Sequence, residues 1–275
     1  MRHLLASASL ALVGTLVPAC GVNQTPQPEP GPVLPQCTPD RDGQITAAEL
    51  PIAYGATAAY YASPAGTTRT VDLAGAGGRW DFADERPDDV VIELGPVALK
   101  DQWYAATFPA GQFAIDGGGG LDGIYHQDAQ ALWLDGTASR EMAPAGGRTL
   151  VHYPQPVALL RFPLAGGDAY TTTAEIADGV IAGLPFVGTD RIEVDVTAGA
   201  TLDVPYVQFS PVLRVRTNVV RQASTTSTPA VNRRTTLFLF ECFGEVTRAE
   251  STVNEPTADF TTASYLRRFA LGVTP

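Results

Sequence analysis

The sequence predicts a mainly β fold for most of this 275-residue chain. Runs of alternating apolar and polar residues recur along it, with the period of a strand that buries one face. Glycine (27 residues) and proline (22 residues) punctuate these runs closely, as in antiparallel sheets joined by short turns. No stretch longer than about twelve residues keeps the 3.6-residue period of an amphipathic helix.

Short strands separated by turns are expected in the first half of the folded region. The candidate strands are residues 71–73, 79–82, 90–94, 103–108, 112–115, 123–126, 131–134, 149–153 and 157–162. Glycine- or proline-containing turns separate many of them, which favours antiparallel neighbours. Helix is expected chiefly near residues 47–61, as one short N-terminal segment, with a further candidate at residues 263–271.

Alternation is clearest in the second half. Residues 191–196 and 200–204 both alternate, and Ala198-Gly199 between them predicts a hairpin turn. Residues 212–219 have the same period, which places Arg214 and Arg216 on one face.

The last predicted hairpin joins residues 235–242 to residues 244–251. Between it and the preceding strand, the Ser/Thr-rich residues 223–230 predict a mobile loop. All of these segments fit one β-rich domain of residues 37–275, and a chain of this length can bury a substantial core.

The N-terminus has the pattern of an export signal. A short basic start precedes an uncharged, mostly apolar run at residues 4–17, which is too short to span a bilayer comfortably. The following "VPAC", residues 17–20, resembles the lipobox of bacterial lipoproteins. That resemblance implies a signal peptide of residues 1–19 and an acyl group, such as palmitate, on Cys20. An ordinary secretory signal with a chance cysteine is the alternative.

A proline-rich tether follows the cysteine. Residues 21–36 hold five prolines, which predicts an extended spacer between an acylated Cys20 and the domain. Gly21 after the cysteine resembles the sorting pattern of outer-membrane lipoproteins. The expected location is therefore the cell envelope, anchored by lipid to the outer membrane, with the periplasmic or surface face left open.

The cysteine count is consistent with export. If Cys20 carries lipid, Cys37 and Cys242 remain, and two cysteines in an oxidising compartment predict one disulfide. Two separate buried thiols are the alternative. The bond would fasten the start of the domain to a strand near its end.

Charge limits the range of partners. The formal net charge is −11, and loss of Arg2 with the signal peptide would leave −12. An acidic chain lacks the basic surface that neutralises phosphates, so no nucleic-acid partner is expected. The membrane is the expected partner, through the N-terminal lipid, and a protein or apolar-ligand partner is left open.

Four segments carry a resemblance to a group of exported bacterial β-rich lipoproteins without an assigned activity. They are "FPLAGGDAY" (162–170), "GATLDVP" (199–205), "PVLRVRTNV" (211–219) and "LFLFECFGEV" (237–246). The resemblance covers residues 157–250 and implies architecture only. A strongly curved antiparallel sheet, like the open barrels of periplasmic lipoprotein carriers, is the expected form, and a two-sheet sandwich is the alternative.

No catalytic residues are predicted, and an enzyme is not expected. After signal removal the chain retains His126 and His152, and it contains no recognisable nucleophile, zinc or phosphate-binding motif. His126 near Asp128 is the best candidate for a base with an orienting carboxylate. His152, in an apolar strand, is expected to pack.

The segment "CTPDRDGQITAAELP" (37–51) resembles half of an EF-hand or dockerin calcium loop. Its alignment implies the calcium ligands Thr38, Asp40, Asp42, Gln44 through its carbonyl, and Glu49 as the bidentate one. Thr38 stands where an aspartate is usual, so weak binding is expected. The same letters also read as a capped turn without metal, because residues 46–49 form a capping box.

Two function classes remain. The first is a non-enzymatic envelope lipoprotein with a structural or binding role and weak calcium binding. The alternative is a carrier that shelters an apolar ligand or lipid in a half-open barrel. The side chains on the concave face distinguish these classes, since a carrier needs a cavity there.

Overall fold

The computed structural model describes residues 36–225 and 228–272. The chain divides after Gly31, and all described residues belong to the second unit. The predicted signal peptide, the predicted lipid site Cys20 and the tether up to residue 35 lie outside the described residues.

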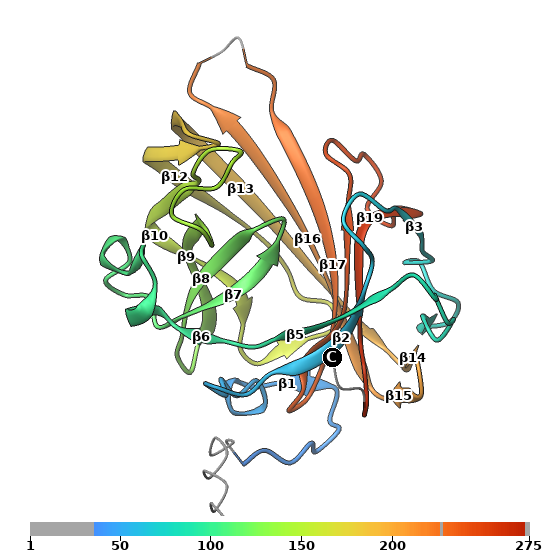
Figure 1. The fold of residues 1–275 in the computed structure, drawn as a ribbon. Helices are drawn as coiled ribbons and strands as arrows, with labels where there is room; N and C mark the ends of the chain where they lie inside the picture. The colour runs from blue at the N-terminus through green and yellow to red at the C-terminus, as the bar shows by residue number, and fades with distance from the viewer. Residues whose placement is uncertain (1–35, 226–227, 273–275) are drawn as a thin grey trace, which may run out of the picture. The chain divides into compact units, whose positions relative to one another are not determined.

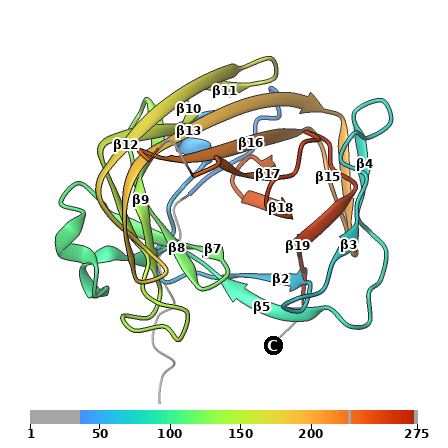
Figure 2. The ribbon, with the colours of Figure 1, turned by 90° about the horizontal axis from the view of Figure 1, so that it is seen from above.

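The described chain is mainly β and forms one strongly curved antiparallel sheet (Figures 1 and 2), as predicted. This sheet has fourteen strands and is not closed by hydrogen bonds. Its neighbour order is β5-β2-β19-β18-β17-β16-β13-β12-β10-β9-β8-β7-β6, and β3 also pairs with β19. The strands are β2 (Ala58–Ala62), β3 (Arg69–Thr70), β5 (Val90–Leu94), β6 (Val97–Ala98), β7 (Phe113–Gly118), β8 (Leu121–Gln127), β9 (Ala131–Ser139), β10 (Leu150–Arg161), β12 (Ala169–Ile181), β13 (Leu184–Gly199), β16 (Val212–Ala223), β17 (Val231–Phe240), β18 (Gly244–Ser251) and β19 (Thr262–Phe269).

The two edges of this sheet are joined by one stretch of chain. Edge strand β5 pairs with β2, and edge strand β6 pairs with β7. Only Gly95 and Pro96 separate β5 from β6. A Cβ on Gly95 would lie 2.1 Å from the carbonyl oxygen of Ala56, so a side chain there would force the two segments apart. The sheet curves back on itself, and its edges are connected covalently.

The longest strands show why the sheet forms. β13 and β16 pair without a register shift, from Gly188 opposite Ala223 to Gly199 opposite Val212. Along β13, Ile192 and Val194 are buried while Arg191 is exposed. Strict alternation fixes the register, because a slip by one residue would turn every apolar side chain outward.

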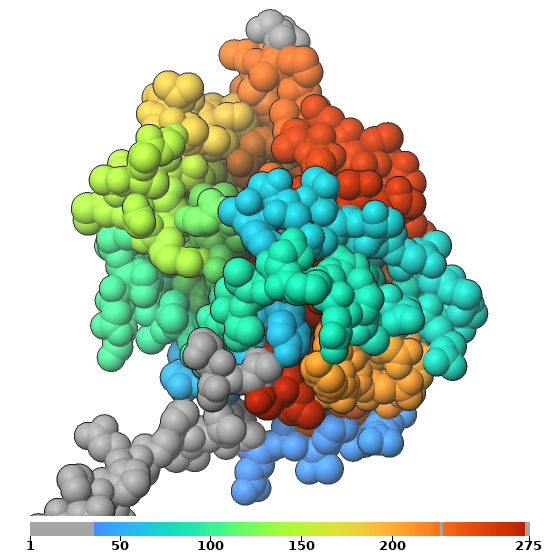
Figure 3. Space-filling model, turned by 45° about the vertical axis from the view of Figure 1, so that its right-hand side comes forward, coloured from blue at the N-terminus to red at the C-terminus, as the bar shows by residue number. Residues whose placement is uncertain are grey.

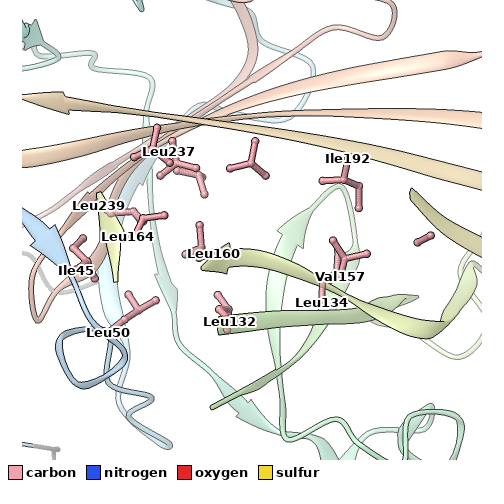
Figure 4. Close-up of a cluster of buried hydrophobic side chains, with 14 of the residues drawn as sticks. Ile45, Leu50, Leu132, Leu134, Val157, Leu160, Leu164, Ile192, Leu237 and Leu239 are labelled. Carbon is pink, nitrogen blue, oxygen red and sulfur yellow. The ribbon is translucent and has the colours of Figure 1, made fainter. Parts of the chain in front are cut away.

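A hydrophobic cluster lies on the concave side of the sheet. Figure 4 shows leucine, isoleucine and valine side chains from β9, β10, β13 and β17 meeting between the strands. Ile45 and Leu50, from the N-terminal segment, join the cluster. Ile45 belongs to β1 (Gln44–Ile45), which pairs with β11 (Leu164–Ala165) in a small separate sheet. The labelled residues in this cluster are Ile45, Leu50, Leu132, Leu134, Val157, Leu160, Leu164, Ile192, Leu237 and Leu239.

A second cluster lies on the convex side, where a three-stranded sheet packs on β17 to β19. Its strands are β4 (Arg79–Asp81), β14 (Thr201–Val204) and β15 (Val207–Phe209). Trp80 and Phe82 pack edge-on against Phe238, with ring centroids 5.0 and 5.6 Å apart. Two sheets therefore face each other only over this part of the large sheet.

The predicted hairpin of residues 191–196 and 200–204 is wrong. β13 pairs with β12 and β16, whereas β14 pairs with β15 and, in parallel, with β4. The chain leaves the large sheet at Gly199. A Cβ there would lie 2.0 Å from the Trp80 ring, so the close approach of Trp80 requires glycine. The "AG" pair serves this contact instead of a hairpin turn.

The last predicted hairpin is confirmed by the pairing of β17 with β18. The predicted loop at residues 223–230 lies between β16 and β17, although residues 226–227 are outside the described part of the chain.

Helix is shorter than predicted. In place of a helix at residues 47–61, there is one 3-10 turn, η1 (Ala47–Glu49), followed later by strand β2. The candidate helix at residues 263–271 is strand β19, which pairs with β18. Pairing with neighbouring strands overrides the local helix preference of both segments.

The predicted strand at residues 103–108 is instead a turn region containing η3 (Ala105–Thr107), which follows η2 (Leu99–Asp101). Buried residues of this region form a third hydrophobic cluster with β7, β8 and β9. The aromatic residues Tyr104 and Phe108 serve this covering role, so their apolar character does not indicate a strand.

Candidate functional site

Three carboxylates meet at the N-terminal end of the described chain. Asp40, Asp42 and Glu241 each place an oxygen within 4.8 Å of the others. The two aspartates are exposed on the loop before β1, whereas Glu241 is 2 % exposed and follows β17. Residues about 200 positions apart therefore form one acidic cluster.

Backbone N–H groups hold this cluster together. Glu241 Oε2 accepts a hydrogen bond from the backbone N–H of Arg41 at 2.8 Å. Asp40 Oδ1 accepts from the N–H of Asp42 at 3.0 Å, and Asp42 Oδ1 accepts from that of Gln44 at 2.7 Å. Arg41 has φ 63° and Gly43 has φ 83°, which turns the loop tightly enough to bring both aspartates together.

The other predicted ligands have different positions. Glu49 Oε2 accepts hydrogen bonds from the N–H of Thr46 at 2.9 Å and from its hydroxyl at 2.8 Å. Glu49 is thus part of the predicted capping box. Gln44 begins β1, opposite Ala165. Glu49 does not belong to the group of three carboxylates.

A disulfide fastens the cluster. Cys37 and Cys242 are bonded, with their Cα atoms 5.5 Å apart. This is the predicted pairing, and it brings Glu241 next to the loop. The N–H of Cys242 also donates to the carbonyl of Glu49 at 2.7 Å, which ties the turn after β17 to η1.

The donor set matches the chemistry of a hard cation. Calcium prefers six to eight oxygen ligands, with carboxylates binding through one or both oxygens. Asp40, Asp42 and Glu241 offer three carboxylates, and one oxygen of each already accepts an N–H. Although Arg41 lies between the two aspartates in the chain, no ion pair joins a basic side chain of the described residues to these three carboxylates. Three such charges are the kind of set that a divalent cation neutralises.

The contribution of Glu241 could have been found from the sequence. Glu241 directly precedes Cys242, so pairing Cys37 with Cys242 brings a glutamate close to Asp40 and Asp42. The loop pattern considered only ligands within twelve consecutive residues. A disulfide makes distant residues neighbours, so the pairing of the cysteines is the sequence signal that points to Glu241.

The chain matches no family model, no curated protein and no solved structure. The resemblance to exported β-rich lipoproteins therefore stays a prediction. Within the described ranges, no helix has the length and apolar character needed to cross a membrane.

A second group of charges lies on the concave side of β18 and β19. Arg248 stands opposite Leu237 and Arg267, and Leu237 belongs to the concave cluster. A register shift in β18 places Glu245 opposite Leu239, so Glu245 and Arg248 share this side. Glu245 binds Arg248 at 2.9 Å and also pairs with Arg267.

These buried charges compensate each other. Burial by itself would raise the pKa of Glu245, but Arg248 and Arg267 outweigh this effect and lower that pKa to about 2. Glu250 extends the group through Arg248 at 3.3 Å and Arg233 at 3.9 Å. Because the carboxylates already have cationic partners, the group reads as a structural network.

The two described histidines make different contacts. His126 Nδ1 lies 2.8 Å from Asp135 Oδ2, not from the expected Asp128, and its ring stacks on Trp133 with centroids 5.9 Å apart. Asp128 accepts N–H groups of its own turn. His152 packs edge-on against Phe108 at 5.5 Å, as expected for a packed side chain.

Burial raises the pKa of Asp135, although its hydrogen bond to His126 works against this shift. This pair joins two neighbouring strands, since His126 lies in β8 and Asp135 lies in β9. No serine, threonine or cysteine is bonded to this pair among the described residues.

A pocket of about 470 Å³ lies beside the connected sheet edges. Leu99, Phe108 and Tyr54 supply apolar walls, while Lys100 and Gln112 supply polar groups. Its volume is within the range of small-molecule sites, which is about 300–1,000 Å³. It lies over the η2–η3 region, outside the concave cluster.

Proposed function

We propose that this protein is an envelope lipoprotein, anchored through acylated Cys20, whose β domain has a non-enzymatic structural or binding role. The observation that carries the proposal is the Cys37–Cys242 disulfide. The bond uses two of the three cysteines and leaves Cys20, at the end of the predicted signal, as the remaining one. A disulfide also fits an oxidising compartment such as the envelope.

The side chains on the concave face support a structural or binding role. Hydrophobic residues from facing strands fill this side, and buried ion pairs occupy the region beside them. Of the described histidines, His126 stacks on Trp133 and His152 packs against Phe108. These arrangements stabilise a fold, and none of them positions a nucleophile beside a base.

Weak calcium binding belongs to the proposal. The loop spacing and the meeting of Asp40, Asp42 and Glu241 support it. In this proposal Glu241 replaces Glu49 as the strong ligand, since Glu49 is hydrogen-bonded within its capping box. With three carboxylates, the expected Kd is on the order of 10⁻⁴ to 10⁻³ M, as in extracellular modules.

Membrane fractionation tests the anchor. The wild-type chain should be in the membrane fraction, with an acylated N-terminal Cys20 by mass spectrometry. Cys20→Ser should be unacylated and lose membrane attachment through the lipid. The matched control is the double variant Cys37→Ser/Cys242→Ser, which removes the disulfide and retains Cys20. An unmodified mature N-terminus at another residue would contradict the proposal.

The alternative function is a carrier of an apolar ligand. The pocket lined by Leu99, Lys100 and Phe108 is the observation that favours it. A ligand there would bind outside the concave face, with its apolar part against Leu99 and Phe108. Titration with a fluorescent fatty acid tests this, and Leu99→Asp should abolish any binding at this pocket.

A further inference from the structure

The turn between β17 and β18 presents a half-exposed aromatic side chain, that of Phe243. Among the large hydrophobic residues exposed in the described ranges, the aromatic ones are Tyr54, Tyr206 and Phe243. Tyr206 lies in the turn between β14 and β15, and Phe243 lies in the turn between β17 and β18. Figure 1 places β1, the β14–β15 hairpin and the C-terminal end of the described chain at the same end.

Phe243 is held in place by other aromatic rings. Its side chain is 52 % exposed, and its ring centroid lies 5.6 to 5.9 Å from those of Phe209, Phe240 and Phe269. Phe209 and Phe240 are buried, so they support the ring from below. Such tilted and edge-on contacts fix the orientation of a half-exposed ring.

The same end receives the N-terminal part of the chain. Phe243 directly follows Cys242, whose disulfide to Cys37 fixes the first described residues beside it. Figure 3 shows the blue N-terminal segment and the amber β14–β15 hairpin at the lower end, with red C-terminal chain beside them. The 35 residues that precede the described chain, including the predicted lipid site Cys20, therefore join the domain next to Phe243.

We propose that the aromatic surface around Phe243 contacts the lipid bilayer to which the chain is anchored. The inference rests on the proposed acylation of Cys20. Exposed Phe, Trp and Leu side chains of interfacial proteins bury in the boundary between headgroups and acyl chains, and Tyr is enriched at the same depth. The disulfide holds the start of the described chain beside this surface. In this proposal the end with Phe243 faces the membrane and the β12–β13 tip faces away.

The tether permits this contact without forcing it. Residues 21–36, extended at about 3.1 Å per residue, could reach about 50 Å. A tethered domain has a millimolar effective concentration at the surface, so a weak affinity of the aromatic surface is enough.

Charge selects the kind of lipid surface. Asp40, Asp42 and Glu241 lie at the same end, and the whole chain has a net charge of −11. Anionic headgroups would repel this end, whereas zwitterionic headgroups would not. The contact should therefore form on phosphatidylcholine vesicles and should not weaken as salt increases.

Depth-dependent fluorescence quenching tests the orientation. The acylated full chain carrying Phe243→Trp would be reconstituted into phosphatidylcholine vesicles that contain lipids with brominated acyl chains. The matched control is Leu184→Trp, at a residue that is 70 % exposed and begins β13. The opposite end of β13 is at Gly199, about 50 Å away along the strand.

The tryptophan at position 243 should be quenched several-fold more than the tryptophan at position 184, relative to the native tryptophans. Equal quenching at both positions, or stronger quenching at 184, would overturn the inference. No quenching at either position, the result expected if this surface binds a protein partner instead of lipid, would also overturn the inference.

Flotation of the Cys20→Ser chain separates this inference from the anchor. This unlipidated chain should bind the same vesicles weakly. Adding Phe243→Ser should lower the bound fraction about tenfold, the size expected for losing a partly buried phenylalanine, and adding Leu184→Ser should not change it. If the wild type is unacylated but Phe243→Ser still lowers binding, the anchor fails and the surface stands. No effect of Phe243→Ser would refute the surface.

Discussion

Glu241 Oε2 accepts a hydrogen bond from the backbone N–H of Arg41, a residue 200 positions earlier in the chain. The Cys37–Cys242 disulfide lies next to this contact, because Cys37 is four residues before Arg41 and Cys242 directly follows Glu241. Together with the disulfide and the hydrogen bond from Cys242 to Glu49, this contact joins the N-terminal loop to the turn after β17 and completes the acidic cluster.

Removing the disulfide should destabilise the domain. The bond closes a separation of 205 residues, and the loop-entropy model gives about 5 kcal/mol for such a closure, with measured values often smaller. Cys37→Ser/Cys242→Ser should therefore lower the free energy of unfolding by a few kcal/mol in urea denaturation. Peptide mapping without reductant should recover one cross-linked pair from the wild type. Free thiols at both positions in protein from the envelope would contradict the pairing.

Calcium titration should distinguish the two candidate glutamates. Calorimetry of the Cys20→Ser chain should show one weak site, abolished by Glu241→Gln and strengthened by Thr38→Asp, which adds a carboxylate at the first loop position. Glu49→Gln should retain the site and change stability little, because a glutamine oxygen at this position can still accept the hydrogen bonds of the capping box.

The opposite result, with binding abolished by Glu49→Gln alone, would assign the ligands of the loop pattern instead. No heat and no thermal stabilisation at about 10 mM calcium, well above the expected Kd, would leave a capped turn without metal.

The buried network predicts a loss of stability in acid. The pKa of Glu245 is lowered from 4.5 to about 2, so between these pH values the unfolded chain binds a proton that the folded chain does not. The carboxylate's contribution is complete above about pH 4.5 and disappears as the pH falls toward 2. A shift of this size corresponds to about 3 kcal/mol.

Glu245→Gln should therefore be less stable than wild type at pH 7, and the difference should shrink by about 3 kcal/mol as the pH approaches 2. Denaturation at several pH values measures this difference. The control is Glu175→Gln, at an exposed position on β12, which should follow the wild-type curve. A difference between Glu245→Gln and wild type that does not depend on pH would show that the charge of Glu245 is unimportant.

The connection between the sheet edges predicts a strict requirement for glycine at position 95. A Cβ there would overlap the Ala56 carbonyl, which is backbone and cannot rotate away. Gly95→Ala should lower the free energy of unfolding by about 1–3 kcal/mol, the usual cost of overpacking. Gly146→Ala is the control, since a Cβ there meets no atom within 4 Å. Equal melting temperatures of the two variants would contradict the close approach.

Much of the fold could be predicted from local pattern. The strand predicted at residues 90–94 is β5, and the hairpin predicted for residues 235–251 is β17 with β18. Strand β12 was missed, although Ala174 and Ile176 alternate with exposed neighbours, because threonine and acidic residues conceal its apolar face. The strand predicted at residues 103–108 is wrong because Tyr104 and Phe108 pack onto β7, β8 and β9 from a turn region, and their apolar character resembles that of a strand.

The candidate site was half predictable. The sequence pointed to the loop of Asp40 and Asp42 and to the Cys37–Cys242 pair. It named Glu49 as the third carboxylate, whereas the structure places Glu241 beside the two aspartates. Glu49 fits two patterns, the last ligand of a calcium loop and the last residue of the capping box at residues 46–49. Local spacing cannot decide between them.

By itself, the sequence determined the β class and the alternation that fixes which faces are buried. It also favoured the pairing of Cys37 with Cys242, which the structure confirms. These properties depend on the period of side chains along a strand and on the count of thiols. Only the tertiary structure decided the neighbours. It joined β14 to β4, turned two expected helices into β2 and β19, and brought Glu241 to Asp40. The reason is physical: backbone hydrogen bonds and contacts between residues far apart in the chain outweigh local preferences, which differ by about 1 kcal/mol or less for ordinary residues.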